Sequence, residues 1–410
     1  MPKLKTLIWF VYNFDSPGGG ERWILEAQKV LRKKGVKTHI ICIKYDEKVL
    51  FNNSYNVPVS VLGRKTPKLG GFIQKSISFL SMVRLLRRQF SLTKPDMIMN
   101  QGLREYVITY LATRFSSYKY SNMDFGQLYQ IGGIDIIYSR FFKIHLSRVN
   151  SFMQSKGEKL EMQTPELSFK KRLQNEVKGL LLYLSYRNAV KIFTLSEKVK
   201  NEAKLQYKRD AIVLKGAYDD KLIRDHISSV SNPSKQKPLI LTIGRLVPHK
   251  RVDLCIRSID MLRRETTNFH FHIGGTGPEL ENLKTLCHEL GVEEYVKFVG
   301  FIDESALMDY YSSCQVFTVM DSADYDITPM VALAMGKRVV CPNIMEFSDE
   351  IINSGQLFRT DPQPQKIAHA MLEALGASPN KSISNMYELY QDYTWDSCFS
   401  KMYNTWISSP

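Results

Sequence analysis

The sequence lacks the patterns typical of disulfide-bonded, zinc-binding or membrane-spanning proteins. Its six cysteines are scattered, with no C-x-x-C pair and no nearby histidine cluster. We therefore expect reduced core cysteines, and neither a zinc site nor a disulfide framework. No run of about 18 apolar residues is present, which argues against a membrane-spanning helix. The N-terminus passes directly into a predicted strand without a secretory signal pattern, so we predict a cytoplasmic protein.

Charge is distributed unevenly along the 410 residues. Residues 1–200 hold 34 Lys and Arg against 14 Asp and Glu, a formal balance of +20, whereas residues 201–410 hold 22 against 27. A basic first half suits an anionic partner, either nucleic acid or a membrane surface. Because zinc-finger, RRM-like and helix-turn-helix signatures are absent, we predict peripheral contact with an anionic membrane and no binding of nucleic acid.

Length and patterning predict two α/β domains. An apolar content of 44% with 24% charged residues is typical of a globular protein, and 410 residues exceed one typical domain. Strand patterns alternate with amphipathic helical patterns, which implies parallel sheets covered by helices on both faces. The predicted strands span residues 4–11, 37–43, 57–62, 97–100, 191–194, 211–214, 239–243, 268–273, 296–299, 315–319 and 338–341.

The stretch 231–238, which contains Pro and Ser, marks the predicted domain boundary. We predict a first domain over residues 1–232, with an insertion near 138–185, and a second over 233–390. A C-terminal helix over 391–410 is expected to cross back to the first domain.

The stretch Gly244–Asp253 is the strongest candidate site in the sequence. It follows a buried strand and opens a helix whose apolar positions recur at helical spacing. Arg245 and Lys250 therefore meet beyond the carboxyl end of a strand, where open α/β sheets bind ligands and a helix N-terminus favours an anion. A diphosphate suits this arrangement. The alternative is that both cations are solvated loop residues.

Other segments have two interpretations each. The loop Gly18–Gly20 is either a plain tight turn or a place where backbone approaches a ligand. The basic amphipathic helix 72–90 either lies on an anionic membrane or is a domain helix with a solvated face. The region 138–185 mixes aromatic residues with cations, as in Phe169–Arg172. It is either an acceptor or membrane contact or a solvated helical hairpin.

Several motifs in order resemble those of the family 4 glycosyltransferases. Gly18–Arg22 is similar to that family's G-G-x-E-R, and Gly244–Lys250 to its G-R-L-x-x-x-K. Further likenesses are Gly274–Glu279 to G-x-G-P-E, Val299–Phe301 to F-x-G-F, and Asp324–Gly336 to E-D-F-G-I-T-P-V-E-A-M-A-x-G. The resemblance is strong over 239–375 and weak over 40–190.

The resemblance implies the GT-B fold, in which two Rossmann-like doubly wound domains face a cleft. It also implies a nucleotide-sugar donor, transfer with retention of configuration and no metal or other cofactor. Fixed cations would stabilise the departing diphosphate. The residues expected at the donor are Gly19, Gly20, Arg245, Lys250, Gly275, Phe301, Thr328 and Pro329.

The sequence departs from the family pattern at its two motif glutamates. Ala323 and Val331 stand where those glutamates contact the transferred sugar and the ribose, and Asp326 replaces the glycine between them. Asp321, Asp324 and Asp326 are candidates to replace the first carboxylate, and we predict Asp324 and Asp326 as catalytic residues.

Two further alternatives concern carboxylates. The family usually has a histidine near the sugar, and the comparable region 120–126 offers only Asp124, which we predict to be catalytic. The D-x-D spacing of Asp324 and Asp326 also occurs in metal–diphosphate sites, but acids at a helix start are the preferred interpretation.

We therefore predict a hexosyltransferase, with a mannosyltransferase as one option. Its predicted acceptor is a lipid-linked or surface glycan at the inner face of a membrane. The alternative is a catalytically degenerate relative that serves as a binding or scaffold subunit.

Overall fold

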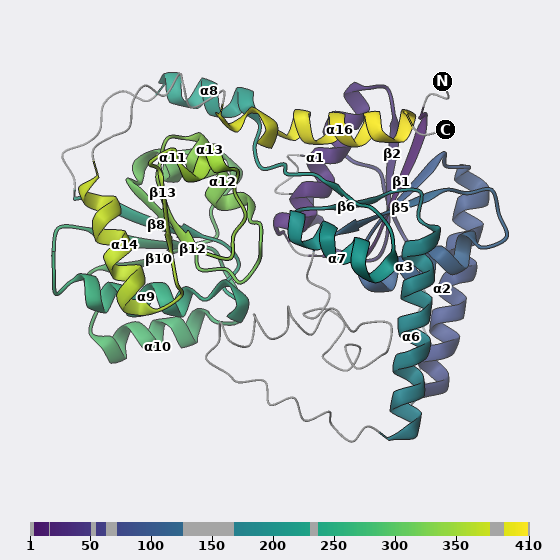
Figure 1. Cartoon of the computed structure of the whole chain (residues 1–410), viewed down its shortest axis with the longest axis horizontal. Coiled ribbons are helices and arrows are strands. Elements are labelled where there is room, and N and C mark those ends of the chain that lie inside the picture. The colour runs from purple at the N-terminus through teal and green to yellow at the C-terminus, as the bar shows by residue number, and fades with distance from the viewer. Residues whose placement is uncertain are drawn as a thin grey trace. The chain divides into compact units, whose positions relative to one another are not determined.

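The computed structural model describes residues 4–15, 17–50, 55–62, 72–125, 168–229, 237–377 and 389–408. It separates into two compact units (Figure 1), of which unit 1 comprises Met1–Leu214 and Phe399–Pro410, and unit 2 comprises Lys215–Cys398. This division precedes the predicted linker 231–238, most of which lies outside the described residues. The predicted insertion near 138–185 also lies largely outside them, and its last part belongs to a long helix.

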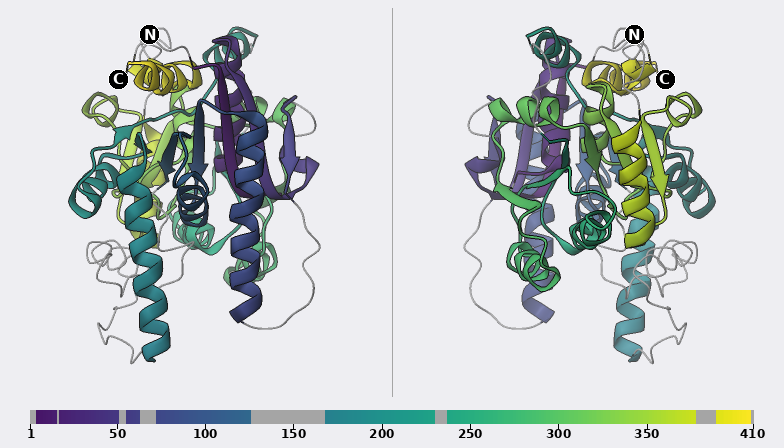
Figure 2. Two further views of the ribbon diagram at one scale, coloured as in Figure 1. Left: turned by 90° about the vertical axis from the view of Figure 1, so that its right-hand side faces the viewer. Right: turned by 90° about the vertical axis from the view of Figure 1, so that its left-hand side faces the viewer.

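Unit 1 has, among the residues described, a seven-stranded parallel sheet in the order β3-β2-β1-β4-β5-β6-β7. Its strands are β1 Thr6–Phe14, β2 Lys37–Tyr45, β3 Val59–Val61, β4 Met97–Gln101, β5 Tyr120–Asp124, β6 Ile192–Thr194 and β7 Ile212–Val213. Its helices are α1 Gly19–Lys33, η1 Glu47–Leu50, α2 Phe72–Thr93, α3 Leu103–Thr113, α6 Phe169–Asn188 and α7 Glu197–Tyr207. The long helices α2 and α6 extend past the strand ends in the same direction (Figure 2).

Unit 2 has, in its described part, a six-stranded parallel sheet in the order β10-β9-β8-β11-β12-β13. Its strands are β8 Leu239–Ile243, β9 His270–Gly274, β10 Val296–Gly300, β11 Val316–Thr318, β12 Arg338–Pro342 and β13 Leu357–Thr360. Its helices are α8 Asp220–Ser229, η4 Pro248–Lys250, α9 Val252–Leu262, α10 Leu280–Leu290, α11 Glu304–Ser313, α12 Ile327–Ala334, α13 Asp349–Ile352, α14 Pro364–Gly376 and η5 Gln391–Tyr393. The helix α16 Trp395–Ile407 begins in unit 2 and ends in unit 1.

The two sheets share one strand order. In each, the first strand (β1 or β8) lies inside the sheet, and the next strands add on one side before the chain returns to the other. Each sheet therefore has a switch point, between β1 and β4 or between β8 and β11, where loops at the carboxyl ends diverge and ligands usually bind. The predicted pair of Rossmann-like α/β domains is confirmed.

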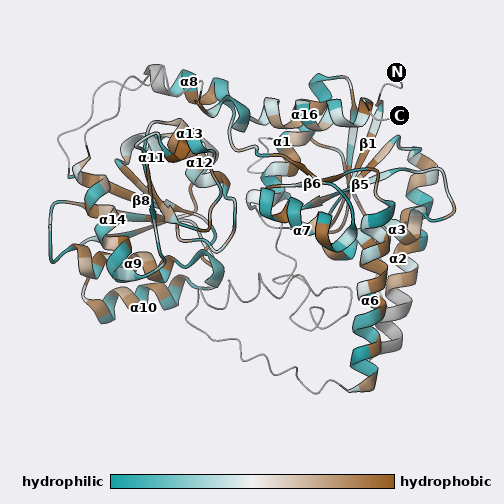
Figure 3. Ribbon diagram, viewed as in Figure 1, coloured by the Kyte–Doolittle hydropathy of each residue, from teal (hydrophilic) through white to brown (hydrophobic). Residues whose placement is uncertain are grey.

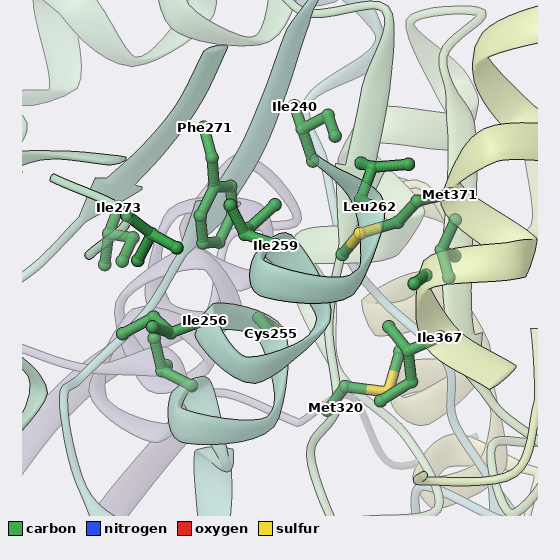
Figure 4. Close-up of a cluster of buried hydrophobic side chains, with 14 of the residues drawn as sticks. Ile240, Cys255, Ile256, Ile259, Leu262, Phe271, Ile273, Met320, Ile367 and Met371 are labelled. Atoms are coloured by element: carbon green, nitrogen blue, oxygen red, sulfur yellow. The ribbon is translucent and has the colours of Figure 1, made fainter. Parts of the chain in front are cut away.

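Apolar side chains hold each unit together. The colouring in Figure 3 places hydrophobic residues on the strands and on the helix faces that cover them. In unit 2, Ile256 and Ile259 of α9 pack with Phe271 of β9 and Met371 of α14 (Figure 4), and all four are fully buried. Each such burial contributes about 1.5–3 kcal/mol. All six cysteines are free and buried, as predicted.

Strand β5 buries polar side chains in its middle. Ser121 and Asn122 are fully buried in its middle. The indole Nε1 of Trp406, from α16, donates to Ser121 Oγ at 3.0 Å, and Asn100 Nδ2 donates to Asn122 Oδ1 at 3.1 Å. These tertiary hydrogen bonds offset part of the cost of burying Ser121 and Asn122, although Asn122 Nδ2 has no hydrogen-bond partner among the described residues.

Candidate functional site

The switch point of unit 2 lies between two loops, one after β8 and one after β11. Within the described residues a small pocket lies at the ends of these strands, and it is lined by Thr242, Ile243, Gly244, Arg245, Leu246, Lys250, Val252, Gly274 and Val319. The predicted stretch Gly244–Lys250 therefore borders a pocket, together with residues from β9 and the end of β11.

Glycines let two loops of unit 2 pack backbone against backbone. Gly244 N donates to Gly274 O at 3.0 Å, and Leu246 N donates to Thr276 O at 2.9 Å. A Cβ on Gly275 would lie 1.8 Å from Gly244 O, and Gly275 also has φ +126°. Gly275 is thus required for this packing, beside the donor contact we predicted for it.

Lys250 is enclosed by two carboxylates from the opposite loop. Its Nζ donates to Asp321 Oδ2 at 2.6 Å and to Asp326 Oδ2 at 2.5 Å. The two carboxylate side chains are 2% and 9% exposed, and the lysine side chain is 20% exposed. The lysine stem runs beside Gly244, whose added Cβ would lie 3.9 Å from Lys250 Cε. The ion group therefore joins the two loops across the switch point.

Asp326 has a second role at the start of α12. Its Oδ1 accepts from Thr328 N at 3.1 Å and from Thr328 Oγ1 at 3.2 Å, which caps the helix. Its other carboxylate oxygen bonds Lys250. Pro329, in the same helical turn, is buried. The structure thus brings together four of the predicted site residues: Lys250, Asp326, Thr328 and Pro329.

Burial and mutual attraction set the protonation of this group. Burial would lower the pKa of Lys250, but Asp321 and Asp326 outweigh it and raise the pKa above its usual value. Burial would raise the pKa of Asp326, and Lys250 holds it below the usual range. The lysine is therefore charged at neutral pH. Burial lowers the pKa of the neighbouring His249 below its usual value, which favours the neutral imidazole.

Arg245 differs from Lys250 because its side chain is exposed and, within the described part of the chain, is not enclosed by carboxylates. Its side chain is exposed and lines the pocket. Among the described residues, no hydrogen bond or ion pair holds its guanidinium. Phe301, another predicted donor residue, directly follows β10 and is 48% exposed. Of the two predicted diphosphate cations, Arg245 is thus the accessible one.

Unit 1 has a glycine-lined turn at its own switch point. Gly19 and Gly20 begin α1, and an added Cβ on Gly20 would lie 2.9 Å from Gln101 Nε2, at the end of β4. Trp23 anchors the helix by packing on Trp9, with ring centroids 5.7 Å apart. These contacts place the backbone of the glycine turn at the carboxyl end of β1.

Asp124 is part of the core of unit 1. It is 3% exposed, and the phenol of Tyr186 in α6 donates to its Oδ2 at 2.7 Å. A catalytic carboxylate needs access to the sugar, so this position gives Asp124 a packing role in the described structure. Its catalytic role remains a prediction.

Sequence patterns did not reveal Glu105. Its carboxylate Oε1 accepts from Tyr12 N at 2.6 Å, where β1 ends. Burial raises its pKa to about 7, although the hydrogen bond from Tyr12 opposes the shift. Gly102, with φ +113°, leaves room for this carboxylate, since an added Cβ would lie 2.6 Å from Glu105 Oε2. A glycine three residues before a glutamate was the only local signal.

Comparison with known proteins shows a likeness to glycosyltransferases. Residues 223–388 match the family described as "Glycosyl transferases group 1". An uncharacterized glycosyltransferase of Haemophilus influenzae is 21% identical over 341 residues, 83% of this chain and 81% of that protein. The fold is similar to that of sucrose-phosphate synthase from Thermosynechococcus elongatus, with a TM-score of 0.71 and 15% identity over 98% of both chains. Residues 223–388 thus resemble that glycosyltransferase family, and the chain as a whole has the GT-B fold.

The descriptions of two further similar proteins mention a nucleotide. Anabaena HepE, solved in complex with UDP and glucose, has a TM-score of 0.69 and 16% identity, with 99% of this chain and 100% of HepE covered. The GDP-mannose-dependent alpha-(1-6)-phosphatidylinositol monomannoside mannosyltransferase of Mycobacterium tuberculosis is 29% identical over 116 residues. That match covers 26% of this chain and 30% of the mycobacterial protein.

The segment that resembles the glycosyltransferase motif lies in unit 2 and has Ala323 and Val331 in place of the two glutamates. Ala323 is half-buried, and its N–H donates to Asp321 Oδ1 at 3.2 Å. Val331 is 4% exposed in α12. Asp324 is half-buried, and its backbone carbonyl accepts from Glu346 N at 2.8 Å. The other two acids of this loop, Asp321 and Asp326, both bond Lys250.

Proposed function

We propose that this glycosyltransferase moves a hexosyl group from a nucleoside-diphosphate donor to a lipid-linked or surface-glycan acceptor, with retention of configuration. The observation that supports it best is the exposed Arg245 beside the pocket at the ends of β8 and β9. A guanidinium presents several donors in a planar fork, which suits the oxygens of a diphosphate. The position at a topological switch point is where open α/β sheets bind nucleotides.

In this proposal, protein cations stabilise the negative charge of the leaving group. Negative charge grows on the diphosphate as the glycosidic bond to the donor breaks, and a fixed cation stabilises that charge. Arg245 is the cation that lines the pocket with an exposed side chain. We assign no metal to this step, so EDTA should leave turnover unchanged. Loss of turnover with EDTA, restored by a divalent ion, would contradict that assignment.

The remaining predicted residues fit secondary roles in this proposal. Phe301 and the turn Gly19–Gly20 would approach the donor, and Asp324 would accept hydrogen bonds from sugar hydroxyls. Asp326 reaches the site through Lys250. Asp124 stays a predicted catalytic residue, and its carboxylate accepts from Tyr186 in the core of unit 1.

The direct test is transfer by the purified protein. It would be given GDP-mannose and a panel of UDP- and ADP-hexoses, with a polyprenyl-phosphate-linked glycan as acceptor. We expect product from at least one donor, and Arg245→Ala should lower donor affinity at least about tenfold, the worth of one good charged hydrogen bond. Arg257→Ala, at an exposed arginine of α9, is the matched control and should have no effect. Absence of transfer and of donor hydrolysis across the panel would refute the proposal.

Membrane contact is part of the same proposal. Within the described residues, no helix combines the length and apolar character needed to cross a membrane. Helix α6, however, has an exposed apolar face formed by Phe169, Leu173, Val177 and Leu180, with Phe169 82% exposed. Lys170, Lys171, Arg172 and Lys178 flank it. An apolar stripe bordered by cations is the pattern of a helix that lies on an anionic surface.

Vesicle flotation tests this contact. The protein should float with phosphatidylglycerol vesicles and less with phosphatidylcholine vesicles, and Phe169→Ser with Leu173→Ser should abolish flotation. Leu205→Ser, at an exposed leucine of α7, serves as the control. Equal flotation of all variants would remove α6 from the proposal.

A second candidate function rests on Ala323 and Val331. Neither side chain can accept a hydrogen bond from a sugar or ribose hydroxyl. A protein that keeps the fold and loses these acceptors could bind a nucleotide sugar without transferring it. Tight nucleotide binding without turnover on any acceptor would favour this binding or scaffold role.

A further inference from the structure

The ion group of unit 2 contains one lysine between two carboxylates. Lys250 is one of two cations expected to bind a donor diphosphate, but its ammonium already bonds Asp321 and Asp326 at 2.6 and 2.5 Å. Three donors are available on an ammonium, and two are used here. A diphosphate that approaches Lys250 therefore meets two carboxylates close to the same nitrogen.

Asp326 is the removable member of this group. It stands where the resembled motif has glycine, which has no side chain and so no charge. Asp321 has a separate attachment, because its Oδ1 accepts from Ala323 N at 3.2 Å and its side chain is almost wholly buried. Buried Arg251 also interacts electrostatically with Asp321. Without Asp326, Lys250 would still be paired with Asp321 and would have one fewer anion beside it.

We propose that Asp326 is a positioning residue that holds Lys250 away from the donor diphosphate and so sets a low affinity for nucleotides, with Arg245 as the leading phosphate contact. This inference rests on the proposed function, since it assumes a diphosphate at this pocket. It explains how two neighbouring cations of one turn differ: Arg245 is exposed and Lys250 is committed to carboxylates. It also assigns Asp326 an effect opposite to that of a binding residue, because its removal strengthens binding.

The variant Asp326→Asn tests this with little structural change. The asparagine oxygen can still accept from Thr328 N and cap α12, and Asn is among the best capping residues. Its amide group is a donor and cannot bond the lysine ammonium, so Lys250 keeps only Asp321. Asp303→Asn removes the same charge from the N-cap of α11, where the side chain is exposed and makes no capping hydrogen bond, and is the control for net charge.

Calorimetric titration with UDP and with GDP provides the measurement. Asp326→Asn should bind at least one of them about tenfold more tightly than the wild type, because the released Lys250 ammonium gains a charged hydrogen bond to the diphosphate. Asp303→Asn should bind like the wild type. Damage to the fold would lower affinity, so a gain cannot come from a merely structural role of Asp326.

A second substitution separates release of Lys250 from a general change of charge. In Lys250→Met with Asp326→Asn the gain should vanish, because no ammonium remains to reach the diphosphate. If the gain persists there, Asp326 acts on the ligand directly and the positioning role is wrong.

The outcomes distinguish this inference from the proposed function. If the wild type binds a nucleotide and Asp326→Asn binds it no better, the inference fails while the proposed function stands. If Asp326→Asn binds and the wild type does not, the inference is supported. If neither binds UDP or GDP at millimolar concentration, both are refuted.

Discussion

The switch points of the two sheets can be compared directly, because both sheets have the same strand order. In unit 2, a cation after β8 is bonded by carboxylates after β11. In unit 1, the turn after β1 has glycines, and the carboxylate that follows β4, Glu105, bonds a backbone N–H at the end of β1. One topology thus supports two chemistries: an ion group that joins two loops, and a glycine turn beside a buried, titratable acid.

The largest expected effect is the loss of the cation in unit 2. Lys250→Met would leave Asp321 and Asp326 buried without their shared partner, so the free energy of unfolding should fall by about 3–5 kcal/mol, as for other buried pairs broken on one side. Urea unfolding of the full chain measures this loss in free energy. Lys366→Met is the control, because Lys366 and Asp361 are both about half exposed, and its effect should stay below about 1 kcal/mol. A similar small loss in both variants would show that the buried group is not a structural joint.

The next effect concerns the glycines that bring the loops together. In Gly275→Ala the new methyl would lie 1.8 Å from a backbone oxygen, at a φ of +126°. We expect a loss of about 3 kcal/mol in unfolding free energy, because backbone must shift in both loops. Gly291→Ala, with φ +61° and nothing within 4 Å, should cost about 1 kcal/mol. Equal losses would mean that strained dihedral angles, and not loop packing, explain Gly275.

A pH dependence is expected from unit 1. Because the folded pKa of Glu105 is raised to about 7, mainly by burial, the folded state holds its proton more tightly than the unfolded chain does. The stability from this group is complete below the unfolded pKa and falls as pH rises through about 7, by on the order of 2–3 kcal/mol. Glu105→Gln should remove this slope between pH 5 and 8 in thermal unfolding. Parallel profiles for the wild type and the variant would contradict the assignment.

The smallest effect is expected at Gly20, the counterpart of Gly275 in unit 1. A Cβ on Gly20 would meet the amide of Gln101 at 2.9 Å, which is the end of a flexible side chain. Gly20→Ala should therefore change unfolding free energy by less than about 1 kcal/mol, because the gain in helix propensity offsets the shift of Gln101. A loss as large as that of Gly275→Ala would show that the glycine turn of unit 1 is packed as tightly as the loops of unit 2.

Local patterns predicted the framework of this site well. The strand before Gly244, the turn and the helix after it are encoded within one short segment, so the position of Arg245 at a strand end followed from sequence. The pairing of Lys250 was not predictable in this way, because its partners lie 71 and 76 residues further along the chain. Such pairing is decided by the tertiary fold.

Unit 1 illustrates the same limit. Strand β5 was not predicted, because its polar residues Ser121 and Asn122 do not resemble a buried strand. Their partners, Trp406 and Asn100, come from distant segments. Asp124, at the end of this strand, was predicted to be catalytic from its place in a motif, whereas its bond to Tyr186 depends on the packing of α6.

Helix α16 has a consequence for how the chain is made. Its residues 399–408 belong to unit 1, where Phe399 packs on Trp23 with ring centroids 4.7 Å apart and Trp406 bonds Ser121. The ribosome synthesises these residues only after all of unit 2. During the synthesis of unit 2, Trp23 and Ser121 lack their contacts with Phe399 and Trp406, although the strands of the first sheet have already been translated. Unit 1 is begun first and can be completed only afterwards, so its last stage of folding follows the translation of unit 2.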